Sequence, residues 1–226
     1  MSAPPIRQRL APGQQITCHR HEEAYVSLVL EGGYEEAGDQ GRRLLGPGDV
    51  AMHGLYTCHR NGVARAGAVI LNLPAHGVSG YFGRVADADA VVRAAERDPV
   101  AAAMALNRSV IRLQAQALDW PDELAAALTA DPQISLADWA QARGLAAETI
   151  SRGFRRAFGV VPKRFRHEVK MRRALAGAIE TAAPLAQVAL DAGFSDQAQM
   201  SRAVSAVTGA APGAWRKASS GDKTGR

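Results

Sequence analysis

Two stretches of this chain decide its fold: residues 135–166, SLADWAQARGLAAETISRGFRRAFGVVPKRFR, and residues 184–216, PLAQVALDAGFSDQAQMSRAVSAVTGAAPGAWR. They align with each other at an offset of 49 residues in their first part and of 50 residues in their second part. The matched pairs are Leu136 and Leu185, Ala137 and Ala186, Ala140 and Ala189, Gly144 and Gly193, Ser151 and Ser201, Arg152 and Arg202, Gly159 and Gly209, Pro162 and Pro212, and Arg166 and Arg216. This agreement indicates two copies of one structural unit.

The repeated unit has the pattern of a helix-turn-helix. Each copy predicts a short helix with a small residue at its centre, Ala140 or Ala189, and a glycine four residues later. A small residue lets two helices cross closely, and a glycine just past a helix end accommodates the turn. An ordinary antiparallel helix pair is the alternative for one copy alone. Two matched copies beside a strongly basic segment favour the helix-turn-helix, whose second helix enters the major groove of DNA.

The positive charge of the chain is concentrated near the first copy. Lys and Arg number 27 against 22 Asp and Glu, a net charge of +5, and all of this excess lies after residue 120. Within Arg152–Arg173 the only acid is Glu168. The basic residues of this segment are Arg152, Arg155, Arg156, Lys163, Arg164, Arg166, Lys170, Arg172 and Arg173. A run of charge is usually a solvated face, but this density indicates a polyanionic partner such as nucleic acid.

Composition excludes several other classes of protein. The 226 residues are 47% hydrophobic and 22% charged, which is typical of a globular chain. No apolar run approaches the roughly 18–20 residues of a membrane span, and the first ten residues lack the apolar core of a signal peptide. Two cysteines are too few for a disulfide scaffold. We therefore expect a soluble protein of the cytoplasm, associated with the nucleoid and without a membrane partner.

The residues of the two copies resemble the AraC/XylS family of bacterial transcription regulators. The resemblance covers about residues 120–217, and its most specific parts are Ala189-Leu-Asp-Ala-Gly-Phe-Ser195 and Thr208-Gly-Ala-Ala-Pro-Gly-Ala-Trp-Arg216. It implies a DNA-binding domain with two helix-turn-helix units joined by a rigid helix at about residues 163–178. It also implies double-stranded DNA and RNA polymerase as partners, and a homodimer as a candidate assembly.

The resemblance also assigns roles to individual residues. The first reading helix would begin near Ala147 and the second near Ser195. Residues placed to read base edges are Glu148, Ser151, Arg152, Gln197, Gln199, Ser201 and Arg202. Arg suits guanine, Gln suits adenine, and Glu can accept from cytosine. Residues placed to contact phosphates are Arg155, Arg156, Lys163, Arg164 and Arg166.

The first eighty residues have a different sequence pattern, which is typical of short β-strands. Segments such as AYVSLVL (24–30) and AGAVILNL (66–73) lie between turn signals, which are Gly32-Gly33, Gly38-Asp39, Gly46-Pro47-Gly48-Asp49 and Asn61-Gly62. They predict a small barrel or sandwich. The stretches from Gly13 to His21 and from Gly46 to His59 resemble the two cupin motifs, and a cupin-like barrel before an AraC-type domain implies effector sensing.

The predicted fold class is therefore α+β with two domains, a small N-terminal cupin-like β-barrel and an all-α domain with two helix-turn-helix units. We expect the barrel at residues 1–80, a helical linker that is a candidate dimerisation element at 81–119, the DNA-binding domain at 120–217, and a disordered tail at 218–226. Asp98-Pro99 predicts a cap and first helical residue within the second of these regions, and Trp120-Pro121 predicts a break at the start of the third.

The cupin resemblance supplies candidate effector or metal residues. His19, His21 and His59 could bring three nitrogens together, and Glu23 would share the face of the first two on a regular strand. A metal-binding cupin carries a glutamate where Tyr25 or Val26 stands here. Two readings remain open: a divalent metal site, or polar residues that line the mouth of the barrel and bind an organic effector.

Each cysteine directly precedes a motif histidine, in Cys18-His19 and Cys58-His59. The two thiols would share a face and could form a thiol sensor for a soft metal or an oxidant. Two small buried cysteines without such a role are the alternative.

The alternative to a transcription regulator is a metal-dependent cupin enzyme, an oxygenase or isomerase with a helical appendage. The missing motif glutamate counts against that alternative, so we expect a protein that is not an enzyme.

Overall fold

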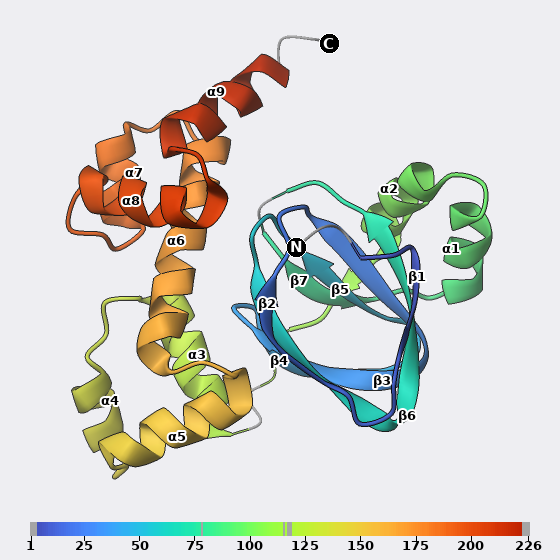
Figure 1. Cartoon of the computed structure of the whole chain (residues 1–226), viewed down its shortest axis with the longest axis horizontal. Helices are drawn as coiled ribbons and strands as arrows, with labels where there is room; N and C mark the ends of the chain where they lie inside the picture. Colours follow the sequence, from blue (N-terminus) through green and yellow to red (C-terminus); the bar gives the residue numbers. More distant parts are fainter. Residues whose placement is uncertain (1–3, 78, 115, 117–118, 223–226) are drawn as a thin grey trace. The chain divides into compact units, whose positions relative to one another are not determined.

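The computed structural model of the chain describes residues 4–77, 79–114, 116 and 119–222. Two compact units are present, one of Met1–Glu123 with Arg152–Val160 and one of Leu124–Ser151 with Val161–Arg226. A β-rich N-terminal region precedes a helical C-terminal region, as predicted (Figure 1). Among the residues that the structure describes, no helix is both long and apolar enough to cross a membrane.

The N-terminal region is one antiparallel sheet of eight strands. The strands are β1 (Arg7–Leu10), β2 (Gln15–Arg20), β3 (Tyr25–Gly38), β4 (Gly41–Leu45), β5 (Asp49–His53), β6 (Cys58–Pro74), β7 (Tyr81–Arg84) and β8 (Ile111–Arg112). They pair in the order β1-β6-β3-β5-β7-β8, with β2 on β6 and β4 on β3. The path ends at β1 and β8 without joining them, so strand pairing within the described chain does not close the predicted barrel.

Two strands are much longer than the sequence predicts. Strand β3 has 14 residues and β6 has 17, and they pair with each other along most of their length. Gly32-Gly33 and Asn61-Gly62, expected to be turns, lie inside these strands. The register shifts on both sides of Gly32, so the first glycine pair marks an irregularity and not a chain reversal.

The boundary at residue 80 is wrong, because the sheet continues beyond it. Strand β7 pairs with β5, and β8 pairs with β7. Helices α1 (Ala88–Ala95) and α2 (Pro99–Ser109) carry Ala95, Ala102 and Leu106 into one core with residues of β3, β5 and β6. The expected linker helices thus cover one face of the sheet, and we call the sheet together with α1 and α2 the β-domain.

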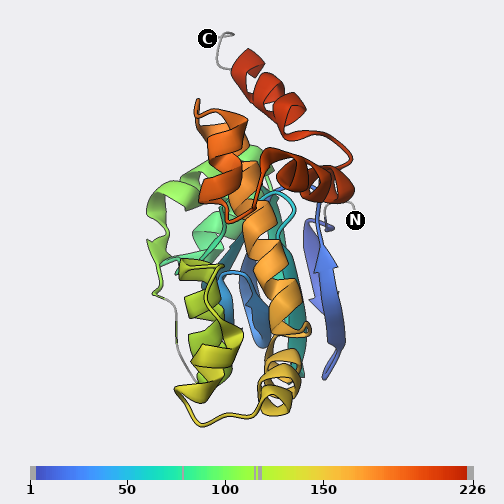
Figure 2. The same cartoon turned by 90° about the vertical axis from the view of Figure 1, so that its left-hand side faces the viewer.

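The C-terminal region consists of helices that follow the predicted repeat. They are α3 (Trp120–Ala130), α4 (Leu136–Gln141), α5 (Ala147–Phe158), α6 (Pro162–Glu180), α7 (Leu185–Asp191), α8 (Gln197–Thr208) and α9 (Pro212–Asp222). Helices α4 and α5 are the first copy, and α7 and α8 are the second. Figure 2 shows α6 as one long helix with α7 and α8 at its C-terminal end, where both contact it.

The two glycines of the repeat end α4 and α7 in the same way. Gly144 and Gly193 have φ of +63° and +88°, values that an L side chain rarely adopts. The next residue in each copy donates its amide back over the turn, Leu145 to the Ala140 carbonyl at 3.0 Å and Phe194 to the Ala189 carbonyl at 2.9 Å. Since these bonds satisfy carbonyls that the helix end leaves open, each glycine fixes the sharp turn to the next helix.

The C-terminal end departs from the expected disordered tail. Helix α9 continues to Asp222, and the Ser219 hydroxyl donates to the Ile179 carbonyl of α6 at 3.2 Å. Earlier in α9, Arg216 Nε donates to the Ala178 carbonyl at 3.2 Å. The sequence after residue 217 is small and polar, which predicts disorder. The contacts with α6 nevertheless keep this part of the chain helical as far as Asp222. The rest of the expected tail, residues 223–226, lies outside the described residues.

Candidate functional site

The predicted base-reading residues lie in the first two turns of α5 and of α8. In α5, Glu148, Ser151 and Arg152 are all exposed. In α8, Gln197 and Arg202 are exposed and Ser201 is half-buried. Helix α5 begins at Ala147 as predicted, whereas α8 begins two residues after Ser195, with Asp196 as its N-cap.

Gln199 does not present a free side chain. Its Oε1 accepts from the Ser195 backbone amide at 3.1 Å and from the Ser195 hydroxyl at 3.2 Å, while the backbone amide of Gln199 donates to Asp196 Oδ1 at 2.7 Å. The side chain therefore belongs to the cap of α8. Asp196 receives the backbone of Gln199 and the Ser195 hydroxyl, and these bonds lower the pKa of its carboxyl.

The basic segment from Arg152 to Arg173 divides into inward and outward side chains. Arg166 donates to the Ile134 carbonyl at 2.6 Å, Lys170 to the Gly193 carbonyl at 2.6 Å, and Arg173 to the Ala130 carbonyl at 2.8 Å. These cations hold α6 to the segment before α4, to the turn after α7 and to the end of α3. Arg166, predicted to contact phosphate, is thus committed to a backbone carbonyl. The exposed members are Arg152, Arg155, Arg156, Lys163 and Arg164.

The Thr-Gly to Trp-Arg pattern that singles out the second copy is structural. Trp215 Nε1 donates to the Thr208 hydroxyl at 3.0 Å, and that hydroxyl donates to the Val204 carbonyl at 3.0 Å. Together with the bond from Arg216 to α6, this places α9 against the end of α8. Thr208, Trp215 and Arg216 therefore fix how α9 packs in the domain. The residues predicted to read bases lie elsewhere, in α5 and α8.

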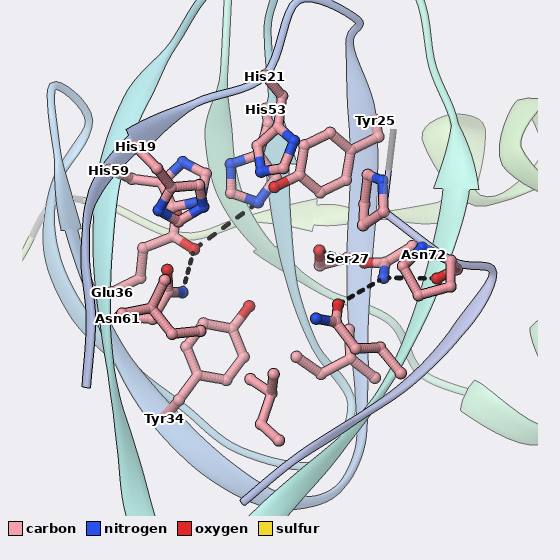
Figure 3. Close-up of a pocket in the computed structure, with 16 residues that line it drawn as sticks. His19, His21, Tyr25, Ser27, Tyr34, Glu36, His53, His59, Asn61 and Asn72 are labelled. Atoms are coloured by element: carbon pink, nitrogen blue, oxygen red, sulfur yellow. Dashed lines mark hydrogen bonds and ion pairs between the residues drawn. The ribbon is translucent and has the colours of Figure 1, made fainter. Parts of the chain in front are cut away.

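A second candidate site is a cavity of about 260 Å³ in the β-domain. Its lining residues are Pro4, Pro5, Gln8, Leu10, Ile16, His19, His21, Tyr25, Ser27, Tyr34, Glu36, His53, His59, Asn61, Ile70 and Asn72. Figure 3 shows the four histidines gathered at one end of this cavity, with Glu36 and Asn61 beside them and with Ser27 and Asn72 at the other end. The volume lies near the lower end of the usual range for small-molecule sites, which suits an ion or a small ligand.

The three histidines of the motifs lie together, and we call them the outer triad. The rings of His19 and His59 have centroids 4.3 Å apart, and those of His19 and His21 are 5.0 Å apart. One nitrogen from each of the three lies within 4.8 Å of the others. Glu23 is not with them: β2 ends at Arg20, and the bend that follows leaves Glu23 exposed. Tyr25, at the place of the motif glutamate, lines the cavity and stacks on His53 with centroids 4.3 Å apart.

Two lining residues escaped the sequence analysis, Glu36 and His53. Both are 2% exposed, and Glu36 Oε2 lies 3.7 Å from His53 Nε2. Asn61, opposite Glu36 in the ladder between β3 and β6, donates to Glu36 Oε2 at 3.2 Å. The alternation of β3 places Glu36 on the face of buried Tyr34, a signal that could have identified it. His53 carries no such signal, because its place depends on how β5 pairs with β3.

Burial sets the protonation of this cluster. It raises the pKa of Glu36 to about 8, against the bond from Asn61 and with a contribution from Asp39. It lowers the pKa of His53 to about 3 and that of His59 well below its usual value, with further lowering from the neighbouring histidines. At neutral pH the imidazoles of His53 and His59 are therefore neutral, and the carboxyl of Glu36 is largely neutral.

At the other end of the cavity the polar groups are partnered. The Ser27 hydroxyl donates to Asn72 Oδ1 at 2.7 Å. The Asn72 amide donates to the Pro5 carbonyl at 2.9 Å and to Gln8 Oε1 at 3.1 Å. This end is a buried network that joins β3 and β6 to the N-terminal segment.

Cys18 and Cys58 are joined by a disulfide with Cα atoms 6.3 Å apart. The bond crosses from β2 to β6, beside the register pair His19 and His59. The fold therefore brings the two cysteine side chains together, so that the thiols of the reduced protein can form this bond.

Comparison with known proteins identifies the C-terminal domain. Residues 139–218 match the family described as helix-turn-helix domain. A search of curated proteins finds no match. Among solved structures, ToxT of Vibrio cholerae bound to an unsaturated fatty acid has 9% identity over 93% of each chain, with a TM-score of 0.44. A transcriptional regulator with an AraC-type DNA-binding domain from Chromobacterium violaceum has 24% identity over 42% of this chain and 87% of its own, with a TM-score of 0.39.

Proposed function

Because residues 139–218 are a helix-turn-helix domain of the AraC type, we propose that this chain reads two adjacent major-groove segments of DNA and regulates transcription in response to an effector in its β-domain. The chain is a DNA-binding transcription regulator. The match over residues 139–218, which covers both copies of the repeat from Trp139 onward, is the observation that carries this function. The enzyme alternative does not account for that domain.

The two reading helices support the proposal for adjacent segments. Arg152 in α5 and Arg202 in α8 occupy equivalent, exposed positions of the two copies. The AraC resemblance implies that a connecting helix places the two reading helices on successive turns of one duplex, about 34 Å apart. The exposed cations of α5 and α6 would contact the intervening phosphates.

The cavity of the β-domain supports the proposal for an effector. It combines apolar walls with a concentrated set of nitrogen and oxygen donors, which is typical of a ligand site. The RNA polymerase contact, the homodimer and the cytoplasmic location remain proposals that the AraC resemblance implies. Exposed Val100 and Met104, one turn apart on α2, are consistent with a surface for a second copy.

Binding to DNA fragments from upstream of the protein's own gene tests the proposal. Fluorescence anisotropy with the full chain should give an affinity for one fragment well above that for scrambled DNA of equal length. Equal affinity for both at every salt concentration would contradict sequence-specific reading.

A further inference from the structure

We propose that Glu36, His53 and His59 bind one divalent transition-metal ion in the β-domain. We call these residues the inner triad. Glu36 lies outside the stretches that resemble the cupin motifs, and neither Glu36 nor His53 is among the residues that the resemblance assigns to a metal. This site therefore differs from the one that the resemblance implies. The inference deepens the proposed function, on which it rests, by naming the class of effector.

The inner triad has the geometry of a ligand set. One donor atom from each residue lies within 4.8 Å of the others. Ligand atoms about 2.0–2.2 Å from a metal are about 3–4 Å apart, so small rotations would close the donors around an ion. The residues come from three paired strands, β3, β5 and β6, which hold their backbones rigidly. The three side chains are 2%, 2% and 4% exposed.

The two histidines of the inner triad also lack partners that a purely structural cluster would supply. Among the described residues, Nδ1 of His53 and Nδ1 of His59 are buried without a hydrogen bond. Glu36 and His53 face each other at 3.7 Å, beyond hydrogen-bond distance. Buried polar atoms are rarely left in this state, because an unpartnered buried group loses its hydrogen bonds to water without replacement. The opposite end of the cavity, where Ser27 and Asn72 are fully engaged, shows that the same domain can satisfy such groups.

The chemistry of the donors selects the class of ion. Two imidazoles and a carboxylate suit Zn²⁺, Co²⁺, Ni²⁺ or Fe²⁺ and disfavour Mg²⁺ and Ca²⁺, which prefer oxygen ligands alone. Asn61 would orient the carboxylate through its bond to Glu36 Oε2, in the manner of groups that support metal ligands. The outer triad offers three imidazoles and no carboxylate, and its His19 is partly exposed.

Cobalt binding to the full-length protein tests this assignment. The protein is stripped with a chelator under reducing conditions and titrated with Co²⁺, whose visible absorption reports coordination, while elemental analysis gives the stoichiometry. We expect one ion per chain, bound without the charge-transfer absorption of a thiolate. Glu36→Gln and His53→Gln should each weaken Co²⁺ binding at least tenfold, whereas the control His19→Gln should change it less than threefold.

The folded state of each variant is checked by circular dichroism. A second measurement, on the wild-type protein, identifies the ligands of the ion without relying on variants. X-ray absorption of the Co²⁺ complex counts its imidazoles, and the inner triad predicts two imidazoles with oxygen ligands.

The inference is overturned by three imidazoles, by Co²⁺ affinity unchanged in folded Glu36→Gln, or by equal loss in His19→Gln. Absence of Co²⁺ binding at micromolar concentration also overturns it. DNA binding by the stripped protein, measured in parallel, separates that result from a failure of the proposed function. If the protein binds DNA selectively but binds no metal, the proposed function stands and only the metal site is overturned.

Discussion

Glu36 and Arg166 show how burial changes the role of a charged residue. Glu36 is enclosed in the β-domain, where its carboxyl stays largely neutral at pH 7. Arg166 belongs to the basic segment but donates to the Ile134 carbonyl. Charge density along the sequence correctly predicts a basic surface, but it cannot tell which cations point outward. That distinction depends on which backbone carbonyls the fold leaves open.

The raised pKa of Glu36 predicts an unusual pH dependence of stability. Because the folded pKa is about 8 and the unfolded pKa is 4.5, the folded state binds more protons between these values. Between pH 6.5 and 8 the free energy of unfolding of the metal-free protein should therefore fall as pH rises, by up to about 1.4 kcal/mol per pH unit. Below pH 6.5, His53 and His59 act in the opposite direction and should outweigh Glu36, because their lowered pKa values keep both imidazoles neutral in the folded state. Stability should therefore be highest near pH 6.5.

Urea unfolding from pH 5 to 8 in the presence of a chelator measures this dependence. Glu36→Gln should flatten the part of the curve where stability falls with rising pH. An identical pH dependence in wild type and Glu36→Gln would show that the carboxyl titrates normally.

Arg152 and Arg166 should respond differently to replacement by alanine. Arg152→Ala removes an exposed side chain of the first reading helix, so it should cost about 1–3 kcal/mol of specific DNA affinity and relax preference at one base position. Arg166→Ala should instead lower the free energy of unfolding by about 1–3 kcal/mol, because it removes a charged hydrogen bond to the Ile134 carbonyl.

Lys163→Ala is the control for a phosphate contact and should weaken binding to all sequences alike. Anisotropy on base-substituted fragments and urea unfolding give the two readouts. Sequence-independent losses for both Arg152→Ala and Lys163→Ala would remove Arg152 from the base-reading residues.

At the scale of elements, the helical half was far more predictable than the sheet. The repeated small residue, glycine and second helix gave the order of α4 to α8, since all of these signals are local. In the sheet, Gly32-Gly33 and Asn61-Gly62 predict turns, but β3 and β6 run through both pairs. The inner triad joins residues from three strands, and strand register depends on contacts between distant segments that no local pattern encodes.

The turn after α4 allows a clean test of backbone conformation. Gly144 has φ +63°, and a Cβ there would meet no atom within 4 Å. Gly144→Ala should therefore destabilise the protein by about 1–2 kcal/mol through backbone strain alone. Gly144→Asn should cost less, because asparagine adopts this conformation more readily. Equal stability of wild type and Gly144→Ala in urea unfolding would exclude the turn geometry described for α4.

The bond between Cys18 and Cys58 ties β2 to β6 across a sequence separation of 40 residues. Oxidation should raise the free energy of unfolding by about 2–4 kcal/mol over the reduced protein, since it restricts the unfolded chain. The double variant Cys18→Ser, Cys58→Ser should behave like the reduced protein under both conditions. Reporter output that is unchanged by oxidant or soft metal in wild type and variant alike would end the hypothesis of a thiol sensor.

The whole molecule combines a β-domain that has a donor-lined cavity with a helical domain that has two helix-turn-helix units. Of the basic segment from Arg152 to Arg173, five side chains are exposed. If each replaces one counterion, log affinity should fall with log salt at a slope of about −4 to −5.

Footprinting of the full-length protein on DNA upstream of its own gene tests the central claim most directly. Two short protected segments about 34 Å apart on one face of the duplex are the predicted result, because α5 and α8 would occupy successive major grooves. Protection should be lost selectively at one segment in Arg152→Ala and at the other in Arg202→Ala. A single segment affected equally by both variants, or no protection even at low salt, would contradict the account.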